Sequence, residues 1–300
     1  PMQINKKVLE VIPMSRFFCD ADCELDYRVI DELGITLIQM PYTIGGEEHL
    51  FDCGRTTDYA TFYGAMRAGA AAKTQALNDY DYMQYFEPVF AAGEDAIYVS
   101  FSHKMSGTFE ALNRALSELY DKYPDRKCTI VDTKSISMGA GLIVYYAAKL
   151  HNDGASDEEV AKFVENFRNK VRVYFTVDDL VYLKRGGRIS SFKAGVGNLL
   201  NIKPMIGIKD GALLNVDSVK GRKKAINTLI NYLEKEDYDC SYPIVILQAD
   251  CEEDGENFKQ SILEKYENAT IWSYAIGPVV GSHCGPNTVG LIFVGKEDKG

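Results

Sequence analysis

Short apolar runs alternate with helical patterns through the first half of the chain, and this alternation restricts the possible folds more than any other feature. Runs over 7–12, 35–40, 95–100 and 127–131 are bounded by polar or turn residues, which is typical of buried strands. Between the last two, apolar residues over 109–123 recur three and four positions apart and predict a helix. Strands that alternate with helices indicate a parallel sheet covered on both faces.

The second half follows a different pattern. Apolar residues alternate with others over 171–177, as in a half-buried strand. Asp210 and Gly211 separate the apolar runs 205–209 and 212–216, which predicts a two-residue hairpin. The other predicted elements are two helices and two strands. One helix covers 156–167 and begins with the capping box formed by Ser156 and Glu159. The second helix covers 225–233, and the strands cover 242–247 and 289–294. A hairpin combined with helices indicates a mixed sheet.

We therefore expect an α/β protein built from two α/β domains. A chain of 300 residues is long enough for two domains of ordinary size. The boundary is expected near residue 169. The first domain, 1–169, would contain a mainly parallel sheet, and the second, 170–300, a mixed sheet.

Composition and charge argue against several classes of protein. Hydrophobic residues make up 46% of the chain and charged residues 25%, which is ordinary for a globular protein. No apolar run approaches the roughly 18 residues of a membrane helix, and no secretory signal is visible, so a cytoplasmic location is expected. The formal net charge of -10 disfavours phosphate binding. We expect no nucleic-acid partner and at most transient membrane contact.

The seven cysteines do not have the spacing of a zinc site. Cys19 and Cys23 form one C-x-x-x-C pair, and neither a second pair nor a pair of histidines completes it. Reduced thiols of a cytosolic protein explain the cysteines more simply. We expect no metal site and no cofactor.

Polar residues gather directly after the third predicted strand. Ser102, His103 and Ser106 lie in the loop, and Gly107 and Thr108 follow where the next helix begins. Loops at the carboxyl ends of parallel strands bind ligands, and the free N–H groups of helix N-termini suit anions. Taken alone, Ser106 is better explained as a helix N-cap, and Gly107 can be explained as a tight turn. The cluster as a whole favours an anion site.

Three more residues are candidates, each with a simpler explanation beside the functional one. Arg188 follows two glycines that let the backbone approach a ligand, and its guanidinium suits a carboxylate. Taken alone, it is better explained as a surface turn whose arginine pairs with a neighbouring acid. His283 lies in a loop rich in Gly and Pro, where it either donates to a ligand or is satisfied by a loop carbonyl. Thr74 alone indicates only a loop.

Several enzyme signatures are absent from the sequence. It contains no G-x-S-x-G elbow, no G-x-x-x-x-G-K-[ST] loop, no G-x-G-x-x-G fingerprint and no H-E-x-x-H motif. A stand-alone hydrolase or transferase that acts on a small acid through Ser102, His103 and His283 is kept as an alternative hypothesis. The spacing of these residues does not support a triad with an acid such as Asp132. A plain interaction protein, without an enclosed apolar cavity, is a third hypothesis.

Taken together, these segments resemble the DegV family of bacterial fatty-acid-binding proteins, in order along nearly the whole chain. The long matches are 179–190 to D-L-x-Y-L-K-K-G-G-R-I-S, 198–205 to L-L-N-I-K-P, and 277–286 to G-P-V-I-G-x-H-x-G-P. The shorter matches are 20–25 to a loose D-S-x-x-D-L, Thr74 to the threonine of T-S-Q-P, 102–108 to S-S-x-x-S-G-T, and 131–135 to D-T-K/R-x-x-S. His103 replaces the family's second serine, and Gln75 follows Thr74 in place of a serine.

The resemblance implies two α/β domains with a ligand tunnel between them that holds a long-chain fatty acid. It also implies a carrier that is not catalytic alone and presents the carboxylate to a separate fatty acid kinase, which forms the acyl phosphate. Hydroxyls at Thr74 and in the 102–108 segment would hold the carboxylate. The residues predicted to bind the fatty acid are Thr74, Ser102, His103, Ser106, Gly107, Thr108, Arg188 and His283.

Overall fold

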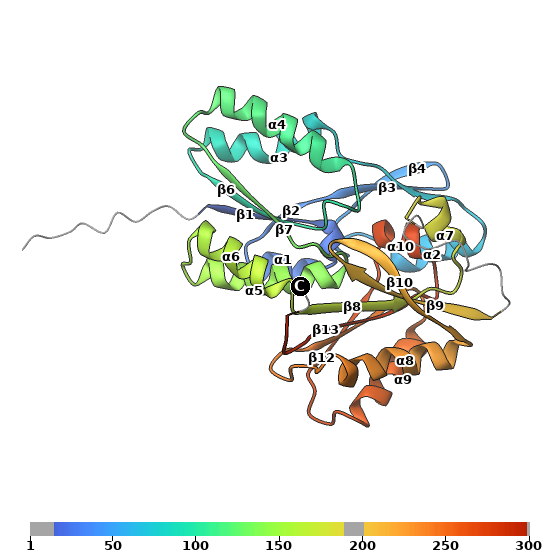
Figure 1. Ribbon diagram of the computed structural model, residues 1–300. Helices are drawn as coiled ribbons and strands as arrows, with labels where there is room; N and C mark the ends of the chain where they lie inside the picture. Colours follow the sequence, from blue (N-terminus) through green and yellow to red (C-terminus); the bar gives the residue numbers. More distant parts are fainter. Residues whose placement is uncertain (1–14, 189–200, 299–300) are drawn as a thin grey trace, which may run out of the picture.

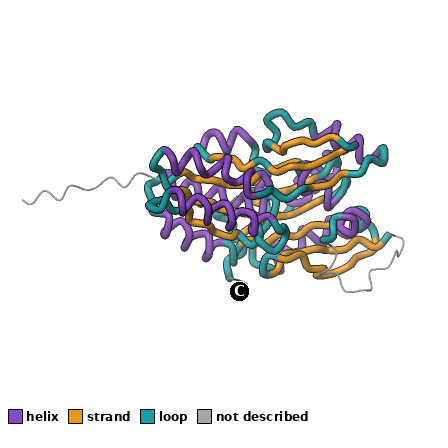
Figure 2. Tube along the Cα trace, turned by 90° about the horizontal axis from the view of Figure 1, so that it is seen from above, coloured by secondary structure: helices purple, strands orange, loops and turns teal. Residues whose placement is uncertain are grey.

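The computed structural model describes residues 15–188 and 201–298. The strand predicted over 7–12 lies outside these residues, as do the end of the 179–190 segment and the beginning of the 198–205 segment. Within the described residues the strands form three sheets (Figure 1). Seen from above, most strands run in roughly the same direction across the molecule, with helices alongside them (Figure 2).

The first sheet is parallel throughout, with strand order β2-β1-β6-β7. Its strands are β1 (Arg16–Asp20), β2 (Thr36–Ile38), β6 (Ala96–Ser100) and β7 (Cys128–Asp132). The predicted parallel sheet is therefore confirmed, and the expected runs 95–100 and 127–131 match β6 and β7 closely. The run 35–40 is divided between β2 and the start of β3 (Met40–Ile44). Strand β1 was not predicted.

Helices cover both faces of the parallel sheet (Figure 1). On one side, α3 (Asp79–Ala91) packs against α4 (Thr108–Lys122), which matches the predicted helix 109–123. On the other side lie α5 (Met138–Asn152) and α6 (Asp157–Phe167). The capping box of α6 is confirmed, because Ser156 and Glu159 each accept a hydrogen bond from the backbone N–H of the other.

Helix α5 lies between the parallel sheet and the second large sheet. It contacts β1 and β6 on one side and β8 and β13 on the other. A helix that is apolar on nearly all sides belongs in such a buried position. Two glycines allow the close approach: a Cβ atom on Gly139 would lie 2.4 Å from Val173 Cγ2, and one on Gly141 would lie 2.3 Å from the carbonyl oxygen of Cys23.

The second sheet is mixed, with order β10-β9-β8-β13-β11-β12, and this prediction is also confirmed. Only β11 and β12 pair in parallel among its described strands. The hairpin turns at Asp210 and Gly211, whose φ values of 49° and 79° fit the predicted two-residue turn. The strands are β8 (Val171–Thr176), β9 (Ile202–Lys209), β10 (Ala212–Lys220), β11 (Ile244–Gln248), β12 (Ile271–Ala275) and β13 (Val289–Val294); α8 (Arg222–Lys235) and α9 (Glu252–Leu263) cover the outer face.

A small antiparallel sheet, which was not predicted, has the order β4-β3-β5. Its remaining strands are β4 (Glu47–Phe51) and β5 (Ala72–Thr74). Helix α10 (Pro278–Cys284) packs against β3, β5 and α7 (Val181–Arg185). A segment from late in the sequence therefore contacts the small sheet. The other elements are η1 (Ala21–Cys23), α1 (Tyr27–Glu32) and α2 (Tyr59–Arg67).

The main hydrophobic core continues across the expected domain boundary. One cluster of buried side chains runs from β1 and α5 to Ile206, Val245 and Ile292 of the mixed sheet. A second cluster lies beneath α8 and α9. The boundary near residue 169 falls between α6 and β8, and the division into domains 1–169 and 170–300 stays a prediction. In the described parts of the chain, every helix is too short or too polar to cross a membrane.

Candidate functional site

A cavity of about 210 Å³ lies where the carboxyl edge of the parallel sheet meets the mixed sheet and α10. Loops that follow parallel strands supply part of its wall, because the carboxyl ends of these strands share one edge. Asp22 follows β1, Ser106 follows β6 and Ser137 follows β7. Most of the remaining wall is apolar: Met40, Phe101, Met105, Ile136, Val173, Phe175, Leu183, Leu213, Leu247, Ile276, Val279, Val280 and Ile292.

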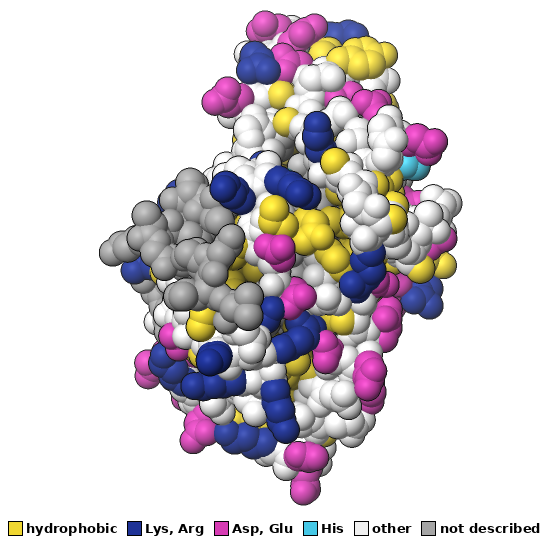
Figure 3. Space-filling model, turned by 90° about the vertical axis from the view of Figure 1, so that its right-hand side faces the viewer, with side chains coloured by type: hydrophobic (Ala, Val, Ile, Leu, Met, Phe, Trp, Pro, Cys, Tyr) yellow, Lys and Arg dark blue, Asp and Glu magenta, His cyan; other side chains and the backbone are white. Residues whose placement is uncertain are grey.

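A second, more open hollow of about 280 Å³ adjoins the polar end of the cavity. The two share Met105, Ser106, Gly107, Arg188 and Leu213. On the face shown in Figure 3, hydrophobic side chains are visible in the middle, with basic side chains (Lys, Arg) and acidic side chains (Asp, Glu) around them. A ligand with an apolar body and a polar head can therefore place its head where the cavity meets the surface.

Thr74 and His283 meet at this end of the cavity, although 209 positions separate them. Thr74 Oγ1 lies 2.9 Å from His283 Nε2. The other ring nitrogen, Nδ1, is buried and has no hydrogen-bond partner within the described residues. Because an orphaned N–H group is rarer in proteins than an orphaned acceptor, we assign the hydrogen to Nε2, which donates to Thr74. The Thr74 hydroxyl then keeps its own hydrogen for a ligand.

The surroundings of His283 keep its ring neutral and fixed. Burial, and then the positive charge of Arg188, lower the pKa of His283 to about 4. The backbone of Gly186 packs against the ring, since a Cβ atom there would lie 2.1 Å from Nδ1. His283 is thus a neutral hydrogen-bonding group near pH 7 and not a cation.

Arg188 supplies the positive charge at the polar end. Its Nη1 donates to the carbonyl oxygen of Gly186 at 2.5 Å, and its Nη2 donates to that of Met105 at 3.0 Å. These bonds tie the segment after α7 to the loop after β6. The guanidinium is half-buried and lines the cavity, so its charge acts with less screening than at an open surface.

Five of the eight predicted binding residues line the cavity, namely Thr74, Ser106, Gly107, Arg188 and His283. The other three do not. The Ser102 hydroxyl donates to the carbonyl oxygen of Gly211 at 2.6 Å and so anchors the β9–β10 hairpin. The Thr108 hydroxyl bonds to the Tyr82 hydroxyl at 3.0 Å and to the carbonyl oxygen of Leu77 at 3.3 Å. His103 stacks on Phe109 with ring centroids 3.7 Å apart. The binding role of these residues stays a prediction.

The residues of the alternative enzyme hypothesis have separate partners. Ser102 bonds to the hairpin and His283 to Thr74, whereas His103 Nε2 lies 3.0 Å from the hydroxyl of Ser100. His103 Nδ1 also lies 4.0 Å from Asp132 Oδ2. The side chains of Ser100, His103 and Asp132 therefore contact one another in the order serine, histidine, aspartate. The serine of this group is fully buried at the end of β6 and does not line the cavity. A substrate therefore has no access to its hydroxyl in this structure.

Asp22 lines the cavity as well, and sequence reasoning did not single it out. Its carboxyl group is almost fully buried, with 3% of the residue exposed. Burial is the largest cause that raises its pKa well above the ordinary value, and the charge of Arg188 opposes this rise. Its position two residues after β1, at the carboxyl edge of the sheet, could have indicated that Asp22 lies in a binding site. This signal was missed because β1 itself was not predicted.

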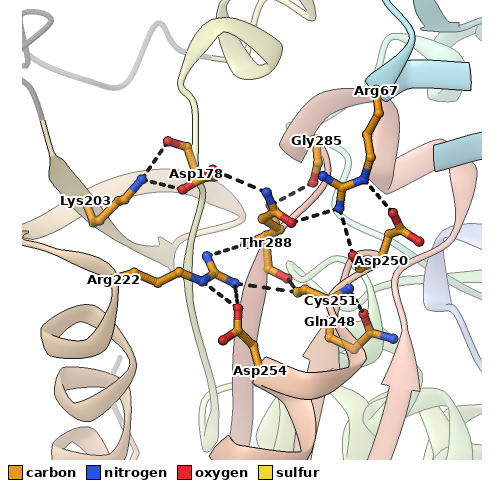
Figure 4. Close-up of polar contacts among 11 residues, drawn as sticks. Arg67, Asp178, Lys203, Arg222, Gln248, Asp250, Cys251, Asp254, Gly285 and Thr288 are labelled. Atoms are coloured by element: carbon orange, nitrogen blue, oxygen red, sulfur yellow. Dashed lines mark hydrogen bonds and ion pairs between the residues drawn. The ribbon is translucent and has the colours of Figure 1, made fainter. Parts of the chain in front are cut away.

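A polar network holds the loop behind α10 (Figure 4). Arg67 of α2 donates to Asp250 Oδ2 at 2.7 Å and to Asn287 Oδ1 at 2.8 Å. Arg222, at the start of α8, donates to the carbonyl oxygen of Asn287 at 2.7 Å. The Thr288 hydroxyl donates toward the last carbonyl groups of α10. The network therefore fixes the helix that carries His283. Within residues 15–188 and 201–298, no cluster of three or more His, Cys, Asp or Glu side chains could hold a metal ion.

Comparison with known proteins places nearly the whole described chain in one family. A sequence profile described as "Uncharacterised protein, DegV family" matches residues 16–296. A DegV domain-containing protein from Clostridium perfringens (strain 13 / Type A) is 38% identical over 280 residues, which are 93% of this chain and 96% of the relative.

Two solved structures show the same fold. A DegV family protein from Thermus thermophilus, described by its fatty acid binding, has a TM-score of 0.82 and 25% identity, and the match covers 94% of this chain and 99% of that one. The Streptococcus pneumoniae Fatty Acid Kinase (Fak) B3 protein, loaded with linoleic acid, has a TM-score of 0.79 and 21% identity, with the same coverage.

Proposed function

The chain belongs to the DegV family, and we propose that it binds a long-chain fatty acid in the cavity between the parallel and the mixed sheets. One observation carries this proposal: an apolar cavity in whose wall Thr74, His283 and Arg188 lie near one another. A small polar substrate would gain little from the long apolar wall. A fatty acid matches both parts of the site.

The apolar wall would supply most of the affinity. Each buried CH₂ group contributes about 0.8 kcal/mol, so a chain of roughly fifteen methylenes gains on the order of 12 kcal/mol before ordering costs. Each hydrogen bond to the head group adds about 1 kcal/mol net. The polar residues therefore mainly decide where the carboxylate lies.

The carboxylate would lie between Thr74, Arg188 and the loop with Ser106 and Gly107. The Nε2–H group of His283 directs the Thr74 hydroxyl hydrogen into the cavity. Arg188 offers the opposite charge, and Ser106 offers a second hydroxyl. Ser102, His103 and Thr108 would not contact the carboxylate and would instead fix the backbone that carries these groups.

We further propose that the protein presents this carboxylate to a separate fatty acid kinase and is not catalytic alone. Support comes from the open hollow at the polar end and from the fold shared with the pneumococcal Fatty Acid Kinase (Fak) B3 protein. Truncation of Arg188 or His283 would then impair phosphoryl transfer more than lipid retention. Equal loss of both in Arg188→Ala and His283→Ala would contradict this division of roles.

The first test is to purify the protein without added lipid, denature it, and identify released molecules by mass spectrometry. A fatty acid in about equimolar amount is the expected result. Ala76→Trp, at an exposed position that lines the cavity, should lower the lipid content, while Ala60→Trp on the exposed face of α2 should not. An empty protein that also takes up no labelled fatty acid would refute the proposal.

A further inference from the structure

Asp22 is an unusual group for the wall of a cavity that would receive a carboxylate. It belongs to the short η1 turn after β1, and 3% of the residue is exposed. Within the described residues no hydrogen bond or ion pair reaches its carboxyl group, although it lines the same cavity as Thr74 and Arg188. Such a buried, unpartnered carboxyl group is costly unless it is neutral or faces a positive charge.

The ionisable groups around Asp22 are mostly acids. After burial, the groups that raise its pKa are Asp20, Glu24 and Cys23, all from the same strand end. Arg188, from the segment after α7, is the cation that lowers it. His283 of α10 adds no positive charge near pH 7, because its own pKa lies at about 4. Among the described residues that line the cavity, Arg188 is therefore the one that carries a positive charge near pH 7.

A bound fatty acid would place a second carboxylate next to the same guanidinium. Two carboxylates that share one buried site cannot both stay ionised, and one of them takes up a proton. Buried charges interact strongly because little water screens them. Asp22 is already biased toward its neutral form by its surroundings, so it is the group that would accept this proton from the solvent.

We propose that Asp22 makes fatty-acid binding proton-linked: the ligand carboxylate binds the form of the protein in which Asp22 is protonated, and the neutral Asp22 then faces the ligand as a hydrogen-bond donor. This inference rests on the proposed function. It adds a residue whose protonation allows the ionised form of the head group to bind. In the binding step, protein with ionised Asp22, ligand carboxylate and one proton from water give the complex. No covalent bond forms or breaks.

The sign of the pH dependence follows from this linkage. Below the pKa of Asp22 in the free protein, the residue is already protonated, and affinity does not change with pH. Above it, each complex takes up a proton, so the dissociation constant rises by up to about tenfold per pH unit until the pKa of the complex is passed.

The test is to titrate the delipidated full chain with tetradecanoic acid from pH 5 to pH 10. The wild type should show the rise, and Asp22→Asn should stay within about twofold over the whole range. Because ionisation of the ligand itself is the same in both proteins, their difference reports Asp22. Glu24→Gln removes a neighbouring buried carboxyl group that does not line the cavity, and it should keep the rise.

Two further measurements keep the result independent of how Asp22→Asn folds. Calorimetry of the wild type in two buffers with different ionisation enthalpies should show uptake of up to one proton per ligand. Tetradecanol, which has no carboxylate, should bind without this uptake. Three outcomes would overturn the inference while leaving fatty-acid binding intact. The dissociation constant of the wild type could stay the same at every pH, it could rise with pH in Asp22→Asn as in the wild type, or Glu24→Gln could lose the rise as Asp22→Asn does. Absence of any binding at all pH values would overturn the proposed function and the inference together.

Discussion

The hydrogen bond between Thr74 and His283 joins two residues that have few other polar contacts. His283 Nε2 has the Thr74 hydroxyl at 2.9 Å, and its Nδ1 has no partner within the described residues. Removal of the hydroxyl would leave a half-buried ring in which neither nitrogen has a partner among the described residues. Such an unpaired group costs about 1–3 kcal/mol, which is more than the bond contributed.

We predict that Thr74→Val lowers the free energy of unfolding by about 1–3 kcal/mol and weakens fatty-acid binding roughly fivefold, the equivalent of one hydrogen bond. Urea denaturation and ligand titration measure the two effects. Thr129→Val is a matched control, because the Thr129 hydroxyl is buried without a partner in the described chain. Its loss should be neutral or stabilising. Equal destabilisation by both substitutions would contradict the role given to the pair.

Glu24 and Asp20 make stability depend on pH in the opposite sense to an ordinary ion pair. Glu24 Oε1 accepts from the N–H of Gly277 at 2.6 Å, and Asp20 accepts from Tyr98 and Phe101 at 2.9 Å each. Burial still dominates and raises the pKa of Glu24 to about 8 and that of Asp20 to about 7. In the unfolded chain both return to about 4.

We predict that Glu24 and Asp20 together lower the free energy of unfolding as pH rises from about 5 to about 8. The folded protein holds protons in this window that the unfolded chain has released, so a higher pH favours unfolding. Denaturation in urea at pH 5, 6.5 and 8 measures the trend, and Glu24→Gln should flatten it. The same trend in the wild type and in Glu24→Gln would show that the Glu24 carboxyl group is ionised in the folded state.

At the scale of elements, α5 decides how closely the two large sheets approach. Its position between them requires backbone contact at Gly141, where a Cβ atom would lie 2.3 Å from the carbonyl oxygen of Cys23. Backbone atoms cannot move aside as the end of a flexible side chain can. A methyl group there would therefore push the helix away from the end of β1.

We predict that Gly141→Ala lowers the free energy of unfolding by about 1–3 kcal/mol, despite the better helix propensity of alanine. Gly64→Ala in α2 is the matched control, because nothing lies within 4 Å of the added Cβ atom. This second change should stabilise the protein by up to about 1 kcal/mol. If both substitutions stabilise the protein, the contact between α5 and η1 is looser than described.

The elements that could be predicted are those with a strong local signal. Asp210 and Gly211 defined their hairpin, and Ser156 and Glu159 defined the start of α6. Strand β1 has no such signal, since Phe17, Phe18 and Cys19 form a continuous buried run without alternation. The small sheet was missed because β4 and β5 are mostly exposed or half-buried and contain no run of buried apolar residues.

The site shows the same limit. Periodicity and spacing could not bring Thr74 to His283, because their contact depends on the packing of α10 against β5. Only the resemblance to a family pointed to both residues. Asp22 lay in a matched segment, at 20–25, but the family pattern gives no reason to expect a carboxyl group in the cavity at this position. Its burial in the wall of the cavity that Arg188 also lines became apparent only in three dimensions.

At the scale of the whole molecule, the core and the network of Figure 4 connect the two halves of the chain. The main hydrophobic cluster includes side chains of β1 and of β13. Arg67 of the first half bonds to Asp250 and Asn287 of the second. The cavity lies at the same junction, so ligand binding and the joining of the halves use the same surfaces.

Because these contacts cross the expected boundary near residue 169, we predict that both halves unfold in one cooperative transition. Trp272 of β12, the only tryptophan of the chain, reports on the second half and packs edge-to-face on Tyr145 of α5 at 5.0 Å. Its fluorescence and the far-ultraviolet circular dichroism should give the same urea midpoint. Gly141→Ala, although it lies in the first half, should shift both midpoints equally. A fluorescence midpoint that stays in place would mean that the mixed sheet is stable on its own, and that the ligand holds together two halves that fold separately.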